Sequence, residues 1–487
     1  MSMRFESTRG ESPKVLAPEA LLSGAAPDGG LYLPDSFPSL SHLLDADLDY
    51  AGLASAVFSA LLPGFPGEEL RLAAESAYPG AFDTPQVAPL VPLGEDYLLE
   101  LFHGPTAAFK DLALQVLPRL MALARERVAP GTRAVVLAAT SGDTGSAAMR
   151  GFRNLPGFRV LAYYPGRGIS AVQEAQMTTM AGDNLEAVAV DGNFDDAQAG
   201  VKAAFARARG CLPPGVLLSS ANSINIGRLV PQIVYYVHAL RALRRMGALP
   251  PGAEADFAVP TGNFGDILAG YLAKAMGLPV GRLLCASNRN RVLADFLETG
   301  VYDRRRELLP SLSPSMDILV SGNLERLLYL ASGRDAARVR GWMEGLNREG
   351  AYRVPPEVLE EIQRDFEGGS ADDAQTRAAI ARAWEAHHAL LDPHTAAGYA
   401  VMRRAARRPG RPRVLLATAS PFKFPRVVLC ALGRPDPGDG AWPEALCEAA
   451  GLPVPPSLAG LSSRPRLHRE RVTRDAVASD ALARALA

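Results

Sequence analysis

The stretch DFAVPTGNFGDILAGYLAKAMG, residues 256–277, places an apolar run, a glycine turn and a helical pattern one after another. The run DFAVP (256–260) is typical of a buried strand, and the residues after the turn are long enough for a helix. Gly262 and Gly265 allow the backbone to curl so that consecutive N–H groups face one anion. The turn is neither a Walker loop nor a GxGxxG motif. Its pattern alone therefore indicates either a phosphate cradle or an ordinary tight turn.

The same alternation of strand-like and helix-like segments continues along the chain from about Leu98. The further strand-like runs are AVVLAA (134–139), FRVLAYY (158–164), LEAVAV (185–190), VLLSS (216–220), RLLCAS (282–287) and RVLLATA (413–419). Runs that are apolar on consecutive residues are expected of strands covered on both faces. Strands alternating with helices predict an α/β fold with mainly parallel sheets.

Three other regions have a different character. The first 95 residues are rich in Pro and Gly turns and carry two helical patterns, 49–62 and 67–78, which favours a separate N-terminal domain or a cap. Residues 320–407 are mostly helical in pattern. Residues 461–487 read as a basic loop followed by one terminal helix.

Composition narrows the class of protein. The 487 residues include 51 Lys plus Arg and 52 Asp plus Glu, a net charge of −1, which is not that of a general nucleic-acid binder. Four distant cysteines form no CxxC pair, so we expect a reduced compartment and a cytoplasmic protein. The first residues lack an apolar signal core, and the longest mostly apolar stretch, 51–65, contains Pro63. We therefore expect a soluble protein that is not inserted into a membrane.

Polar residues follow a second predicted strand at the point where it ends. Ser141, Asp143 and Thr144 lie in the turn between the run 134–139 and the next helical pattern. Ligands of parallel α/β sheets bind at the carboxyl ends of the strands, and a helix N-terminus favours an anion. The alternative is ordinary capping of a helix by Ser or Asp.

Two further segments carry candidate groups. Lys110 precedes an apolar helical pattern in ELFHGPTAAFKDLALQVLPRL (100–120), and desolvation of such an amine suits imine formation. On this pattern alone an ordinary solvated lysine is the better reading. The segment SSANSINIGRL (219–229) is either a binding loop or a polar helix cap, and its polar residues are Asn222, Ser223, Asn225 and Arg228. The motifs HExxH and GxSxG are absent, and no metal site is expected.

Taken together, these segments resemble the threonine synthases, a family of fold-type II enzymes dependent on pyridoxal phosphate (PLP). The segments that carry the resemblance are STRG (7–10), APDGGLYLP (26–34), LFHGPTAAFKD (101–111), ATSGDTG (139–145), YPGRGIS (164–170), SANSINIGRL (220–229), PTGNFGD (260–266), DPHTAAGY (392–399) and LATASPFKF (416–424). The resemblance implies two α/β domains with mainly parallel sheets plus a smaller N-terminal domain.

The resemblance also implies where the domains begin and end. We expect an N-terminal domain over 1–95, a large PLP-binding α/β domain, a small α/β domain, and a C-terminal loop and helix. The large domain would comprise 96–133 and 230–435, the small domain 134–229, and the C-terminal part 436–487.

The resemblance implies a role for each matching residue around the cofactor. Lys110 would form the imine with PLP and later act as the mobile acid and base. The cofactor phosphate would be held by Gly262, Asn263, Phe264, Gly265 and Asp266. Thr418 would hydrogen-bond the pyridine nitrogen, and Asp143 would lie near the cofactor O3′.

It implies further roles around the substrate. The substrate carboxylate would be met by Ser141, Gly142 and Thr144. The candidates for the substrate phosphate are Asn225, Arg228 and Lys423. The chain departs from the family at TASPFKF, where many relatives read TAHPAKF, so Ser420 replaces a common His and Phe422 a common Ala. This departure concerns local substrate contacts more than the PLP site.

The family reaction converts O-phospho-L-homoserine and water to L-threonine and phosphate, and the resemblance implies this activity for the chain. We expect the protein to be a monomer or a homodimer. A serine or threonine dehydratase-like lyase is the alternative enzyme. A catalytically inactive PLP-binding homologue is the second alternative, although the presence of Lys110 argues against it.

Overall fold

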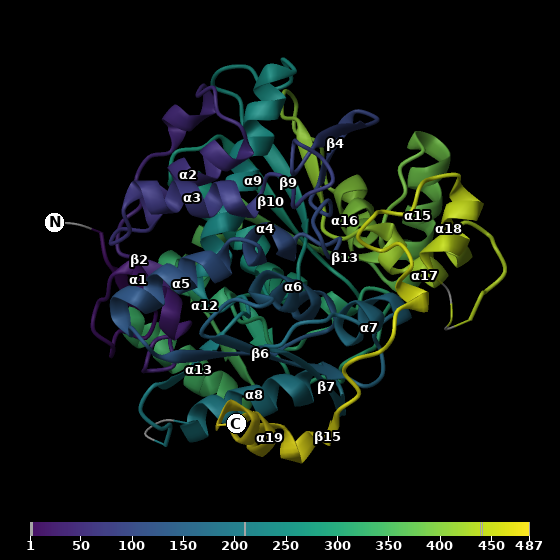
Figure 1. The fold of residues 1–487 in the computed structure, drawn as a ribbon. Helices are drawn as coiled ribbons and strands as arrows, with labels where there is room; N and C mark the ends of the chain where they lie inside the picture. The colour runs from purple at the N-terminus through teal and green to yellow at the C-terminus, as the bar shows by residue number, and fades with distance from the viewer. Residues whose placement is uncertain (1–2, 209–210, 439, 441, 487) are drawn as a thin grey trace.

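The computed structural model describes residues 3–208, 211–438, 440 and 442–486. It contains two mainly parallel sheets flanked by helices, with the N-terminal helices packed on one side (Figure 1). The α/β class with mainly parallel sheets and an added N-terminal region is confirmed. All seven predicted strands are present. Six of them are mostly buried, as expected of apolar runs covered on both faces, whereas the strand at Val216–Ser220 is fully buried only at its last two residues.

The larger sheet has six strands, of which the first five in spatial order are parallel and the last is antiparallel to its neighbour. In spatial order the strands are β13 (Phe366–Ser370), β10 (Val280–Ser287), β9 (Ala255–Pro260), β14 (Arg413–Ala417), β4 (Asp96–Glu100) and β3 (Leu90–Leu93). Two of these strands, β9 and β14, lie at its centre and lead directly into predicted site segments.

The second sheet has five strands, all parallel. In spatial order they are β15 (Arg471–Thr473), β7 (Leu185–Asp191), β6 (Phe158–Pro165), β5 (Arg133–Ala139) and β8 (Val216–Ser220). Along β5, Val135 and Leu137 pack in a cluster with α8 (Phe194–Ala208) and α19 (Val477–Leu486), whereas Val136 faces the main core. Helices α6 (Asp143–Phe152) and α7 (Ala171–Thr178) also belong to this unit.

The remaining helices surround the six-stranded sheet and join the two units. They are α4 (Lys110–Leu114), α5 (Leu117–Val128), α9 (Ile226–Arg245), α10 (Gly265–Ala275), α11 (Val292–Thr299), α12 (Leu324–Ala331), α13 (Ala336–Glu349), α14 (Pro356–Asp365), α15 (Asp373–His387), α16 (Pro393–Arg404), α17 (Pro425–Ala431) and α18 (Pro443–Ala450). A small antiparallel sheet pairs β11 (Val301–Asp303) with β12 (Ala351–Arg353). Together with β13, β12 interrupts the helical region predicted over 320–407.

The N-terminal region packs against α5 and α9. Its elements are β1 (Phe5–Ser7), α1 (Ala17–Ser23), β2 (Tyr32–Pro34), α2 (Tyr50–Leu61) and α3 (Gly67–Ala77). The two helical patterns predicted at 49–62 and 67–78 are thus confirmed. Asp49 caps α2 by accepting a hydrogen bond from the Gly52 N–H at 2.7 Å, as its position before an apolar helix favours.

Four strands of the two large sheets have no counterpart among the predicted strands. β3 and β4 precede the region where the alternation was recognised, and β13 has the sequence FEGGS, whose two glycines disfavour a strand. The terminal segment was predicted as a loop and one helix, but it also contains β15, which pairs with β7. The division into domains at the predicted residue boundaries remains a prediction. No helix among the described residues combines the length and apolar character needed to cross a membrane.

Candidate active site

A cavity lies where the two units meet, at the carboxyl ends of the parallel strands. The loops after β5, β9 and β14 supply residues 140–141 and 143–144, 261–266 and 418–419 to its wall. This is the position that parallel α/β sheets reserve for ligands. The structure brings most of the predicted residues together here; they are Lys110, Ser141, Asp143, Thr144, Arg228, Gly262, Asn263, Phe264, Gly265, Asp266 and Thr418.

Lys110 begins α4, and its amine is largely buried beside the ring of Phe109, 4.5 Å from the ring centre. Burial lowers the pKa of the Lys110 amine below its ordinary value. The carboxylate of Asp143, 3.4 Å away, opposes this shift, while the cation of Arg228 reinforces it. An amine with a lowered pKa is more often uncharged and can react with a carbonyl group.

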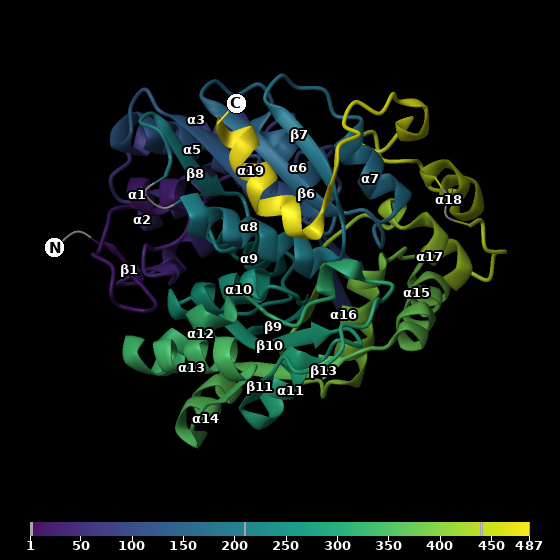
Figure 2. The ribbon, with the colours of Figure 1, turned by 90° about the horizontal axis from the view of Figure 1, so that it is seen from below.

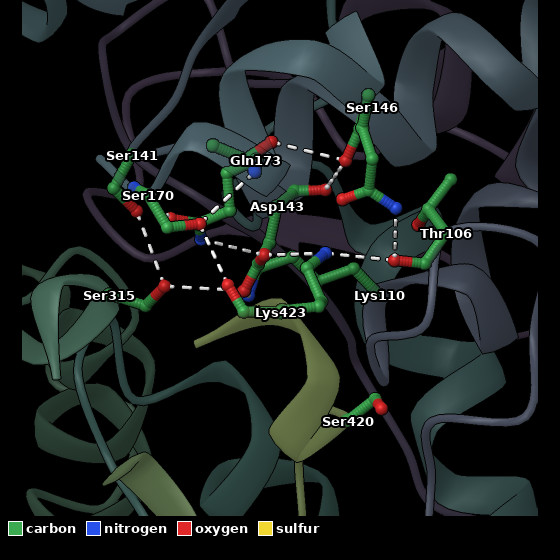
Figure 3. A network of polar contacts seen from close by, with 12 residues as sticks. Thr106, Lys110, Ser141, Asp143, Ser146, Ser170, Gln173, Ser315, Ser420 and Lys423 are labelled. Carbon is green, nitrogen blue, oxygen red and sulfur yellow. Dashed lines mark hydrogen bonds and ion pairs between the residues drawn. The ribbon is translucent and has the colours of Figure 1, made fainter. Parts of the chain in front are cut away.

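Asp143 occupies the first turn of α6 and faces Lys110 (Figure 3). Its Oδ1 accepts from Lys423 Nζ at 2.8 Å and from Gln173 Nε2 at 2.9 Å. Burial alone would raise the pKa of this carboxyl group, but Lys423 and Lys110 hold it well below its ordinary value. Asp143 is therefore a buried carboxylate that stays ionised.

The glycine turn leads into α10 and leaves the first N–H groups of that helix without a side-chain cap. Phe264 adopts a left-handed conformation with φ of 62°. A Cβ atom at Gly262 would lie 2.6 Å from the carbonyl oxygen of Ser315, so the turn requires glycine there. Ser321 Oγ donates to the Gly262 carbonyl at 2.8 Å, and Asn323 Nδ2 donates to the Asn263 carbonyl at 3.0 Å. The turn is thus a fixed cradle of backbone donors that suits a phosphate.

Asp266 differs from the rest of the turn because its side chain is an acceptor. Its Oδ1 accepts hydrogen bonds from the hydroxyls of Tyr235 at 2.5 Å and Tyr236 at 3.1 Å. Burial raises the pKa of Asp266 to about 6. A carboxylate would repel a phosphate, so the backbone of Asp266, and not its side chain, fits the predicted role.

Arg228 is a buried cation on the wall of the cavity, with 2% of the residue exposed. Its Nη1 donates to the Ala221 carbonyl at 2.6 Å, while its Nε is buried without a partner. Burial lowers the pKa of Arg228 to about 10. Among the described residues no carboxylate pairs with this guanidinium, so an anion in the cavity would complete its interactions.

Three predicted substrate ligands do not line this cavity. Asn225 is fully buried, caps α9 by accepting from the Gly227 N–H at 2.9 Å, and donates to the carbonyls of Leu21 and Ser220. Gly142 lies at the start of α6 with φ of 118°, and its N–H donates to Thr140 Oγ1 at 2.9 Å. Lys423 is fully buried against Asp143.

Thr418 and Ser141 connect the cavity wall to its surroundings. The Thr418 carbonyl accepts from the Phe109 N–H at 2.8 Å, which ties the end of β14 to the residue before Lys110. Ser141 Oγ lies 3.3 Å from Ser315 Oγ. Both hydroxyl-bearing residues lie on the cavity wall and can meet a polar ligand.

Sequence reasoning gave no role to several polar residues of the site. His394 lines the cavity, its Nδ1 lies 2.7 Å from Asp392 Oδ1, and its Nε2 accepts from the Ser315 N–H at 3.1 Å. This geometry places the ring proton on Nδ1. His394 stands in the motif DPHTAAGY, which was the only sequence signal for it, and nothing local marked Ser315 or Gln173.

The donor set fits PLP. The amine of Lys110 can react with an aldehyde, and the turn 262–266 offers backbone N–H groups to a phosphate. Because Ser315 lies so close to Gly262, residue 262 has no room for a side chain. The backbone of the turn, and not a side chain, therefore faces a ligand. Among the described residues no three His, Cys, Asp or Glu side chains are grouped to hold a metal ion.

An α/β fold with a buried lysine and a phosphate cradle at the strand ends defines a PLP-dependent enzyme. In agreement, residues 89–418 match the family model described as "Pyridoxal-phosphate dependent enzyme". Residues 4–78 match "Threonine synthase N terminus", and residues 395–480 match "Threonine synthase, C-terminal".

Known proteins of this class resemble the chain over most of its length. Threonine synthase of Pseudomonas aeruginosa is 44% identical over 433 residues, which cover 88% of this chain and 90% of that protein. The structure of PLP-bound threonine synthase from Brucella melitensis is 39% identical with a TM-score of 0.86, and covers 100% of both chains. Threonine synthase from yeast is 33% identical with a TM-score of 0.86, covering 99% of this chain and 98% of that one. The chain belongs to the threonine synthase family, and it is a PLP-dependent lyase.

Proposed function

We propose that the chain converts O-phospho-L-homoserine and water to L-threonine and phosphate. One observation carries this proposal: two separate groups that suit an anion, the glycine turn 262–266 and Arg228, share one cavity with the buried amine of Lys110. A PLP enzyme with an ordinary amino acid as substrate needs one phosphate position. A phosphorylated substrate needs a second, which the guanidinium of Arg228 supplies, since no carboxylate pairs with it among the described residues and its buried Nε has no partner.

PLP, when bound, withdraws electrons from bonds at the substrate carbon atoms. The chain supplies placement and proton transfer. In this proposal Lys110 binds the cofactor and moves protons at the substrate Cα, because burial favours the uncharged form of the Lys110 amine. Asp143 remains ionised within 3.4 Å of Lys110 Nζ and can stabilise that amine when it carries a proton.

The substrate's two anionic ends are assigned to different residues of the cavity. The hydroxyls of Ser141 and Thr144 and the N-terminus of α6 suit the carboxylate, while Gly142 shapes the turn that presents them. Arg228 suits the phosphate. Asn225 acts indirectly in this proposal, because it caps the helix that carries Arg228.

The cofactor's two ends are assigned likewise. The turn of Gly262, Asn263, Phe264, Gly265 and Asp266 suits the cofactor phosphate through its backbone donors. Thr418, which also lines the cavity, offers a hydroxyl group to the pyridine nitrogen. A hydroxyl partner, unlike a carboxylate, favours the neutral pyridine ring and so moderates electron withdrawal.

We also propose that the enzyme acts in the cytoplasm, which its four free cysteines support. A monomer or a homodimer is proposed as its state.

The test is simultaneous measurement of phosphate and threonine from O-phospho-L-homoserine with PLP-loaded protein. Equal amounts of both products are expected, and Lys110→Ala should form neither because no amine remains to hold PLP. Release of ammonia from serine or threonine, without threonine synthesis, would instead identify a dehydratase. Binding of PLP with no product from any of these substrates would identify an inactive homologue.

A further inference from the structure

Lys423 is the fully buried lysine at the end of a short 3₁₀ helix, Pro421–Lys423, that follows β14. It does not line the cavity, although its neighbour in space, Asp143, does. Its Nζ donates to Asp143 Oδ1 and to the Thr106 carbonyl, each at 2.8 Å. These contacts direct its charge into the protein rather than toward a ligand.

The Thr106 contact leads back to Lys110. Thr106 donates to the carboxyl group of Asp111 through both its N–H and its hydroxyl, each at 2.8 Å. Asp111 follows Lys110 in α4. The Thr106 carbonyl also accepts from Gln176 Nε2 at 2.9 Å. Lys423 therefore contacts the loop that positions the start of α4.

The Asp143 contact closes a ring of hydrogen bonds with α7 (Figure 3). Gln173 Nε2 donates to Asp143 Oδ1, and Gln173 and Ser170 form a reciprocal capping box. Ser170 Oγ then donates to the Lys423 carbonyl at 2.8 Å. The ring joins the segment after β14 to α6 and α7, so the position of Asp143 is fixed from both units.

The two oxygens of Asp143 face two different lysines. Oδ1 pairs with Lys423 at 2.8 Å, and Oδ2 lies 3.4 Å from Lys110. If Lys110 were the only cation beside Asp143, nothing would offset the tendency of this carboxylate to favour the protonated form of Lys110. The nearby cation of Lys423 also opposes protonation of Lys110 directly.

We propose that Lys423 is a positioning residue: its ion pair holds Asp143 in place, and its positive charge offsets the effect of that carboxylate on Lys110, so that the Lys110 amine stays available in its uncharged form. This role replaces the predicted contact with the substrate phosphate. It rests on the proposed function of Lys110 as the reactive amine, but it concerns the protein without cofactor and can be tested there.

The experiment measures the reactivity of individual lysines in PLP-free protein by trace labelling with an amine reagent and peptide mass spectrometry. Labelling from about pH 6 to about pH 11 gives the titration midpoint of each amine. In Lys423→Gln the midpoint of Lys110 should rise by about one pH unit, so that its labelling near neutral pH falls about tenfold. Lys423→Arg keeps the cation and should leave the midpoint close to that of the unchanged protein.

Lys274→Gln is the matched control. Lys274 is also paired with a carboxylate, Asp365 at 2.7 Å, but it lies at the far end of α10 from the glycine turn. This variant should leave the Lys110 midpoint unchanged.

Two results would overturn the proposal. An unchanged Lys110 midpoint in Lys423→Gln, with a raised KM for the phosphorylated substrate, would return Lys423 to a phosphate-binding role. An unchanged midpoint with only a lower melting temperature would make it purely structural. If Lys423→Gln does not fold, Lys423→Met, which keeps a side chain of similar length without the charge, is measured in the same way, and an unchanged Lys110 midpoint there would overturn the proposal. Because no PLP is present, failure of threonine synthesis would leave these results readable.

Discussion

Arg228 combines burial with an unsatisfied charge, a combination that is costly unless a ligand relieves it. Removing a cation from water costs several kcal/mol, and the usual compensation is a carboxylate. Here the guanidinium donates to one backbone carbonyl and keeps a buried Nε without a partner. An anion that enters the cavity can accept hydrogen bonds from this guanidinium and so offset the cost of burying its charge.

We therefore expect Arg228→Gln to raise KM for O-phospho-L-homoserine by about 10- to 100-fold, since charge-assisted hydrogen bonds to the phosphate are lost. Steady-state kinetics will measure this. Arg241→Gln is the control, because Arg241 is also a buried arginine of α9 that donates to backbone carbonyls, those of Ala46 and Leu48, but it does not line the cavity. An unchanged KM in Arg228→Gln would assign the phosphate to another group.

Asp266 predicts a pH dependence of stability. Burial raises its pKa from 3.8 to about 6, so the folded protein favours the protonated form. The associated stability is fully present below about pH 4 and is lost as the pH rises through about 6. Asp266→Asn is uncharged throughout, so its stability relative to the unchanged protein should improve by up to about 3 kcal/mol between acidic and neutral pH.

Denaturant unfolding of PLP-free protein at several pH values will test the Asp266 prediction. Asp303→Asn provides a control of opposite sign, because hydrogen bonds from Arg305 lower the pKa of Asp303 to about 2. That variant should lose relative stability, or stay level, as the pH rises. A constant difference between Asp266→Asn and the unchanged protein would contradict the raised pKa.

At the scale of elements, the turn between β9 and α10 depends on the absence of a side chain at Gly262. A Cβ atom at Gly262 would lie 2.6 Å from the Ser315 carbonyl oxygen. Gly262→Ala should displace the Ser315 segment or the turn and weaken PLP binding at least about tenfold, because the backbone donors lose their alignment. Titration with PLP, followed by its visible absorption, will measure this.

The control for Gly262→Ala is Gly341→Ala in α13, where an added Cβ meets nothing within 4 Å. That helix should gain stability by up to about 1 kcal/mol, and PLP affinity should stay unchanged. Equal PLP affinity in both variants would show that the turn tolerates a side chain.

The elements differ in how far the sequence determines them. Strands such as β5 and β9 were predictable because burial on both faces demands an unbroken apolar run. β13 and β15 were not predictable from the sequence. The first is glycine-rich and the second is a short, mostly polar segment, and each forms a strand because it pairs with the edge of a sheet in the folded chain. Tertiary contact, and not local preference, creates such strands.

The site divides in the same way. The turns 141–145 and 262–266 are local motifs, and their glycines mark them in the sequence. The pairing of Lys423 with Asp143 joins residues 280 positions apart, and the contact of His394 with Ser315 spans 79. No periodicity reveals such contacts. Lys423 was accordingly predicted as a substrate ligand, whereas in the fold it is paired with Asp143, and it is Asp143 that lines the cavity.

At the scale of the whole molecule, the last part of the chain crosses from one unit to the other. α17 and α18 pack with the six-stranded sheet, whereas β15 and α19 complete the five-stranded one (Figures 1 and 2). Figure 2 shows α19 lying beside α8, and Val477 of α19 is fully buried there. The contact is close, because a Cβ atom on Gly200 would lie 2.4 Å from that of Val477.

Gly200→Val should therefore lift α19 from α8 and loosen the five-stranded unit. Hydrogen exchange measured by mass spectrometry should show faster exchange in β7, α8 and α19, and unchanged exchange in β9 and β10. Gly341→Val is the control for placing a β-branched residue in a helix. Unchanged exchange in α19 would show that the helix adjusts without detaching.

The return of the chain to β7 also bears on how the gene can be divided. The five-stranded unit is encoded by two separated stretches, roughly the codons for β5 to β8 and those for β15 and α19. A duplication or recombination that carried only the first stretch would deliver a sheet with an unpaired β7 edge and an uncovered α8. Exchange of this module between genes thus requires both stretches to travel together, and the intervening coding sequence is inherited with them.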